Sequence, residues 1–114
     1  MDSTADREAL RSVSRAAFGQ SHRLELMLEI ANLEDGIFTM TQVSKALDVT
    51  MSSLQNARDA LLQLGLISRL PLTDSRFHYL VRNDSSAWAW ARELAARGNV
   101  LSEDRGVVTV TGRG

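Results

Sequence analysis

The sequence predicts a mainly α-helical domain with one small β-hairpin, and three observations lead to this fold class. Two helix starts, at 38–43 and 49–54, each place a threonine where it can cap the helix and an apolar pair across that cap. Only the five residues 44–48, ending in Ala46-Leu47-Asp48, lie between the two starts, so the two helices must cross steeply. The segment 66–82 then alternates like two strands around a Thr73-Asp74-Ser75 turn. Together these features predict a winged helix-turn-helix, in which the hairpin is the wing.

The predicted winged helix-turn-helix domain covers residues 1–98, with the two-helix motif at 39–64 and a C-terminal tail at 99–114. Its N-terminal helix is expected at 6–18, with Ser3 or Thr4 as its cap and Gly19 as its stop.

The second helix, expected at 21–33, is apolar around most of its circumference, which predicts a central position in the fold. Glu25 and Glu29 are expected to form its polar edge. Ile37 and Phe38 are candidates for a very short strand that pairs with the wing.

The last helix, expected at 85–97 with Gly98 as its stop, carries both tryptophans of the chain. Trp88 and Trp90 are about 200° apart around a helix, so one can pack on the domain while the other needs a partner. We therefore expect the two terminal helices to form a homodimer interface; the alternative is a single core with one tryptophan under the N-terminal helix. The expected interface residues are Leu10, Val13, Trp88, Trp90 and Leu94.

The composition restricts the function. The chain has no cysteine, which excludes disulfides, thiolate metal sites and thiol nucleophiles, and no run of apolar residues is long enough to span a membrane. A cytoplasmic protein is therefore expected. No side-chain pattern indicates an enzyme, a metal or another cofactor, and His22 and His78 suit structural or phosphate-contacting roles. The formal net charge is −1, so any positive field for nucleic acid must be local.

The chain from Gly19 to Arg82 resembles winged-helix bacterial regulators of the ArsR and MarR types. The resemblance rests on the helix at 23–30, on Val43-x-x-Ala46-Leu47, on Thr50 to Leu54, on Leu61-x-x-Leu64-Gly65-Leu66-Ile67 and on the strand at 76–80. It implies double-stranded DNA as the partner, with the second motif helix in the major groove and the wing on the backbone. Relatives commonly carry Arg or Lys where Asn56 and Asp59 stand. The metal-sensing branch is not supported, because it needs Cys or a His-carboxylate set on the last helix.

Helical geometry places Leu54, Ala57, Leu61 and Leu64 on the buried side of the second motif helix, and Ser52, Gln55, Asn56, Asp59 and Gln63 on its outer side. Gln55 and Asn56 have the paired donor and acceptor that suit adenine. The expected DNA-binding residues are Ser52, Ser53, Gln55, Asn56, Arg58, Arg69 and Arg76.

The leading hypothesis is a homodimeric DNA-binding transcriptional repressor. A protein-interaction module with weak or no DNA binding is the alternative, because Asp59 and the low pI of about 6.1 oppose phosphate binding. A small-molecule effector is possible but no feature indicates one; a pocket for it would be lined by Phe18, Met27, Trp88 and Trp90.

Overall fold

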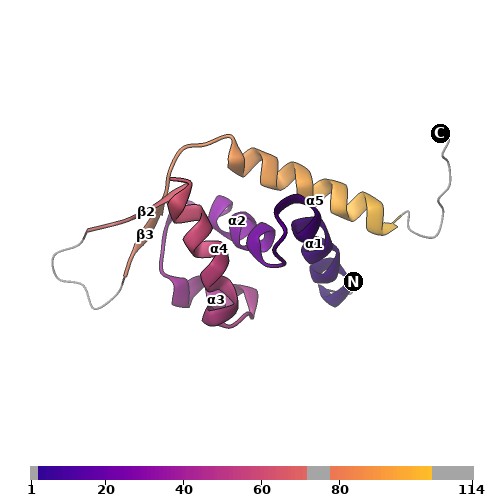
Figure 1. Cartoon of the computed structure of the whole chain (residues 1–114), viewed down its shortest axis with the longest axis horizontal. Coiled ribbons are helices and arrows are strands. Elements are labelled where there is room, and N and C mark those ends of the chain that lie inside the picture. Colours follow the sequence, from indigo (N-terminus) through magenta and orange to yellow (C-terminus); the bar gives the residue numbers. More distant parts are fainter. Residues whose placement is uncertain (1–2, 72–77, 104–114) are drawn as a thin grey trace.

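The computed structural model describes residues 3–71 and 78–103, and side chains at 7–71 and 78–98. Its described part is mainly helical with a small antiparallel sheet, which confirms the predicted fold class (Figure 1). The predicted turn at 73–75, Arg76 and the end of the tail lie outside the described residues. The elements are α1 (Ser3–Phe18), α2 (Arg23–Ala31), β1 (Ile37–Phe38), α3 (Met40–Leu47), α4 (Met51–Gln63), β2 (Ile67–Arg69), β3 (Leu80–Arg82) and α5 (Ala87–Glu103).

The central helix is α2, which contacts α1, α3, α4 and α5. Leu24, Leu26 and Ile30 are fully buried, as the apolar circumference of the segment predicts. The helix is shorter than the expected 21–33, and the expectation for Glu25 is wrong. Glu25 is buried rather than at a polar edge, because Arg11 Nε donates to its Oε1 over 2.9 Å and His22 Nδ1 lies 2.6 Å from the same oxygen.

Both predicted threonine caps of the two-helix motif are confirmed. Thr39 Oγ1 accepts from the Gln42 N–H over 3.1 Å, and Thr50 Oγ1 accepts from the Ser53 N–H over 3.2 Å. Asp48 closes α3 in the left-handed conformation, at φ 55°. Each cap satisfies an amide that the helix leaves without an internal partner, so two short helices form within a few residues of each other.

The sheet has the strand order β1-β3-β2, so the predicted short strand exists and lies beside the wing. Phe38 pairs with Leu80, and Arg69 pairs with Leu80 from the other side. Phe38, Ile67 and Leu80 are buried, and they fasten the sheet to the helical core. The wing therefore starts from a fixed base.

The expected end of the last helix at Gly98 is wrong, because α5 continues through Gly98 to Glu103. A Cβ on Gly98 would lie 2.9 Å from Val13 Cγ2, so this glycine allows α1 and α5 to approach closely. The helical part of the chain thus extends past the expected domain limit at 98.

At the other end of the chain, α1 begins at Ser3, so Ser3 and Thr4 lie within the helix and do not precede it as caps.

The two tryptophans of α5 have different surroundings. Trp88 is 6% exposed and its Nε1 donates to the Asn83 carbonyl over 2.7 Å, so it belongs to the core of its own chain; the dimer interface itself stays a prediction. Trp90 is 45% exposed and packs edge-to-face on Phe18, with the ring centroids 5.5 Å apart. Of the other expected interface residues, Leu10, Val13 and Leu94 pack, partly buried, against the core.

Met27 is buried with Trp88, so these two residues do not line an open effector pocket.

Within the described ranges, no helix is both long and apolar enough to cross a membrane.

Candidate nucleic-acid interface

The outer face of α4 is polar and exposed, because the opposite face anchors the helix. Leu54, Ala57 and Leu61 are buried, which confirms three positions of the predicted stripe. The fourth is wrong: Leu64 is 65% exposed, since α4 ends at Gln63 and the chain turns away there. The exposed residues of the outer side are Ser52, Ser53, Gln55, Asn56, Asp59 and Gln63.

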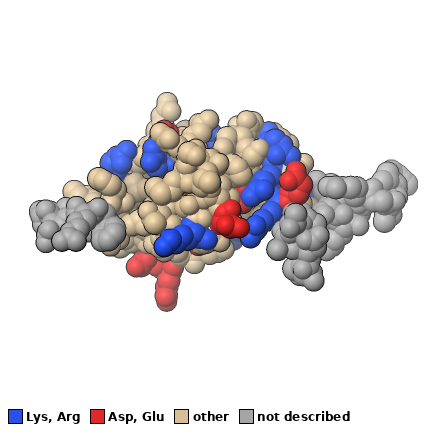
Figure 2. Space-filling view, turned by 90° about the horizontal axis from the view of Figure 1, so that it is seen from below, with Lys and Arg blue, Asp and Glu red and all other residues tan. Residues whose placement is uncertain are grey.

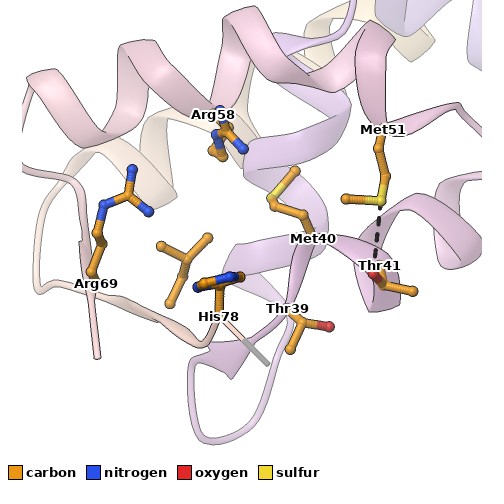
Figure 3. Close-up of a pocket in the computed structure, with 8 residues that line it drawn as sticks. Thr39, Met40, Thr41, Met51, Arg58, Arg69 and His78 are labelled. Carbon is orange, nitrogen blue, oxygen red and sulfur yellow. Dashed lines mark hydrogen bonds between the residues drawn. The ribbon is translucent and has the colours of Figure 1, made fainter. Parts of the chain in front are cut away.

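A hollow of about 300 Å³ separates α4 from the base of the wing (Figure 3). Arg58 borders it from α4, Arg69 from the end of β2 and His78 from the segment before β3. Met40 and Leu80 are the buried apolar residues that line it. The fold therefore gathers three nitrogen-bearing side chains from separate segments beside the outer face of α4. Sequence reasoning named Arg58 and Arg69 as DNA-binding residues, and it gave His78 a structural or phosphate-contacting role without counting it among those residues.

Arg58 is not an isolated cation. Its Nε and Nη2 both donate to Asp59 Oδ1, over 3.0 Å and 2.8 Å. The Arg58 side chain is 26% exposed and that of Asp59 is 55% exposed. Sequence reasoning expected Arg58 to contact the DNA backbone, but it did not foresee that Asp59 already pairs the charge of Arg58.

Arg82, the last residue of β3, is bonded to backbone carbonyls inside the protein. Its Nη1 donates to the carbonyls of Ile30, Ala31 and Leu33, over 2.7 Å, 3.2 Å and 2.8 Å. Arg92 Nη2 also donates to Ala31 O, over 2.9 Å. These guanidinium groups satisfy the carbonyls at the C-terminal end of α2, where a positive charge is also favoured by the helix dipole.

The arginines that recur along α1 are also paired. Arg11 bonds the buried Glu25, Arg15 lies 3.4 Å from Glu8, and Arg7 lies 4.0 Å from Asp48. Their charges are balanced within the chain.

Seen from the side of α3, the surface is mostly uncharged, with basic and acidic side chains interspersed (Figure 2).

The positive charge of the candidate interface is therefore local and small. In the described part of the motif and wing, Lys45 and Arg69 are exposed, while Arg58 and Arg82 are bonded as above. Ser53 is exposed as expected, but its hydroxyl lies 2.8 Å from Thr50 Oγ1 at the cap. Arg76 lies outside the described residues.

The arrangement of a two-helix motif, a third strand and a hairpin around a central helix decides the fold. It is a winged helix. No family model and no curated protein matches the sequence. Among solved structures, the chain is similar to the YusO protein from Bacillus subtilis, with a TM-score of 0.57 and 19% sequence identity over 97% of this chain and 76% of that chain. At this identity the likeness shows the winged-helix fold alone.

Proposed function

We propose that this winged-helix protein is a sequence-specific, double-stranded-DNA-binding transcriptional regulator, homodimeric, acting as a repressor and of the ArsR or MarR type. The observation that carries the proposal is the build of α4. One face is fixed by fully buried residues, and the opposite face exposes a row of hydrogen-bonding side chains. An exposed polar helix next to a wing has the shape that enters a major groove while the hairpin reaches the backbone.

The outer face of α4 supplies sequence readout rather than charge. Gln55 and Asn56 are exposed there, and each has the adjacent donor and acceptor that pair with adenine N7 and N6. Ser52 at the start of the helix suits a phosphate or a base edge. At the wing, Arg69 and His78 are exposed and suit the phosphate backbone.

Electrostatics predicts modest, salt-sensitive affinity. If each protomer neutralises about three phosphates, a dimer neutralises about six, and the logarithmic salt slope is about −5 at 0.9 per phosphate. Arg82 adds nothing to this number because α2 carbonyls hold it.

A homodimer is supported by Trp90, which leaves 45% of its surface exposed next to Phe18. Large exposed aromatic side chains are enriched where partners anchor. Two-fold symmetry would then present two copies of α4 to a palindromic site. Sedimentation tests this directly: wild type should be a dimer, and Trp90→Ala should shift it towards monomer. A wild type that remains monomeric at tens of micromolar would contradict the dimer.

The DNA-binding proposal is tested by titrating labelled duplexes from the protein's own upstream region at several salt concentrations. Arg58→Ala/Arg69→Ala should weaken binding and flatten the salt dependence. Arg97→Ala is the matched control, because Arg97 is an exposed arginine on α5, paired with Glu93 and outside the motif. Unchanged binding in the double variant, or no binding by wild type at low salt, would reject the proposal.

A protein-interaction module is the second candidate, and the Arg58–Asp59 pair favours it because it removes a cation from α4. Recovery of one stoichiometric protein partner, with no DNA retained at low salt, would support this function instead.

A further inference from the structure

The contact between Arg58 and Asp59 decides which of their atoms stay available. Arg58 uses one edge of its guanidinium, Nε and Nη2, and both donate to a single oxygen of Asp59, Oδ1. Nη1 and the second hydrogen of Nη2 form the end of the fork, and within the described ranges no protein acceptor meets them. Asp59 Oδ2 is likewise left as an acceptor. The pair therefore presents two donors and, beside them, one acceptor.

This order of groups is complementary to one base pair. In the major groove a G·C pair shows guanine N7 and O6 as acceptors and then the cytosine N4 amine as a donor. An A·T pair shows an acceptor, a donor and an acceptor, so the second Arg58 donor would face the adenine amine. Two donors followed by an acceptor thus match G·C and are mismatched to A·T.

The pairing with Asp59 also fixes the orientation of the Arg58 guanidinium, whose Nη1 and Nη2 form a two-pronged donor. An isolated arginine on a helix surface can swing between phosphates and bases, whereas two bonds to Asp59 restrict the guanidinium plane. Arg58 is 26% exposed and Asp59 is 55% exposed, so both remain accessible. Together the two side chains carry no net charge, and they add little to phosphate attraction.

We propose that Arg58 and Asp59 act as one unit that reads a G·C base pair in each half-site. This inference rests on the proposed function, and it makes Asp59 a specificity determinant rather than a repulsive charge. The two roles predict opposite results. If Asp59 only repels phosphates, Asp59→Asn strengthens binding to every duplex. If Asp59 orients Arg58, the same change weakens the preference for one base pair.

The experiment is selection from randomised duplexes, followed by affinity measurements on the selected site and on copies with one G·C pair changed to A·T. Wild type should prefer the G·C pair by roughly ten-fold or more, the usual discrimination of a good bidentate contact. Asp59→Asn should lose most of this preference. Arg58→Lys should lose it too while keeping the positive charge, because an ammonium has no fork.

The control is Glu93→Gln, which neutralises the carboxylate of another surface pair, the one with Arg97 on α5. It should leave the preference unchanged. Circular dichroism and thermal melting confirm that each variant is folded.

The failures are distinguishable. If Asp59→Asn raises the affinity for all duplexes by one factor and leaves the selected sequence unchanged, the G·C reading is wrong and DNA binding stands. If Arg58→Lys selects the same sequences as the wild type, with the same preference for G·C at every position, the proposal that Arg58 and Asp59 read a G·C pair is also wrong. If the wild type retains no duplex at low salt, the proposed function fails and the inference fails with it.

Discussion

Polar side chains around α2 are bonded inside the protein, whereas those of α4 and the wing face outwards. At α2, Arg82 and Arg92 donate to backbone carbonyls and Glu25 is buried between Arg11 and His22. On α4, Gln55, Asn56 and Asp59 are exposed, and Arg69 is exposed on the wing. The same residue types thus stabilise the fold in one region and remain available to a partner in the other.

This contrast shows why counting charges along the chain overstates the positive field of the motif. Arg82 is the last residue of the wing strand β3, yet its guanidinium bonds carbonyls at the C-terminal end of α2. Arg58 borders the hollow beside α4, yet its charge is balanced by Asp59. Four pairs of variants test the contrast, from the largest expected effect to the smallest.

The tryptophans of α5 should give the largest difference. Trp88→Ala removes a buried ring and its bond to Asn83 O, and should lower the free energy of unfolding by about 3–5 kcal/mol. Trp90→Ala loses an edge-to-face contact with Phe18 and should cost about 1 kcal/mol. Urea unfolding followed by circular dichroism measures both. Trp88→Phe, which keeps an apolar ring, should fall between them, and equal losses for the two alanine variants would contradict the burial difference.

Arg82→Ala should cost on the order of 3 kcal/mol, because carbonyls at the end of α2 lose a charged donor. Arg69→Ala removes an exposed arginine from the same sheet, and stability should change by less than about 0.5 kcal/mol. The same urea titrations compare them. Only the Arg69 variant should lower the salt slope of DNA binding, by about 1 per protomer. The reverse pattern would mean that the two arginines have been assigned the wrong roles.

Gly98→Leu should destabilise the protein by about 1–3 kcal/mol, because the new side chain would collide with Val13 of α1. Thermal melting measures the effect. Ala96→Leu, at an exposed position of the same helix, is the control and should be nearly neutral. Val13→Ala should recover part of the loss in the double variant. Independent, additive effects would show that Gly98 does not face Val13.

The smallest expected difference lies within one helical turn. Thr50→Ala removes the cap of α4 and should cost about 1 kcal/mol. Ser52→Ala leaves the cap in place and should alter stability by only about 0.3 kcal/mol, while weakening DNA binding through the outer face. Chemical denaturation and duplex titration of both variants separate the two hydroxyls. A larger stability loss for Ser52→Ala would place the cap at the wrong residue.

Sequence reasoning predicted the features that depend on neighbours in the chain. Thr39 and Thr50 cap their helices, and Gly19 ends α1 at a φ of 73°, because each acts on residues only a few positions away. Three positions of the buried stripe of α4 follow from the helix period. That period also predicted opposite sides for Trp88 and Trp90, but not which of them is buried.

The features that were missed depend on distant partners. Glu25 is predicted to face solvent by its helix alone, but Arg11 arrives from α1 to bury it. Gly98 is a helix stop by local rules, but Val13 makes it a packing position within α5. Arg82 lies at the end of the predicted wing, and its position in the sequence does not reveal that carbonyls of α2 lie within reach of it.

The sequence by itself determined the winged-helix architecture, the two caps and the polar outer face of α4, because caps and periodicity are set within one or two turns. Only the tertiary structure decided which charges remain for a partner. An arginine can donate to any segment that the fold brings near it. A buried backbone carbonyl without a donor costs free energy, so a nearby arginine tends to be used to satisfy it. The sequence therefore specified α4 with its exposed polar face, and the packing of the chain specified how little positive charge surrounds that face.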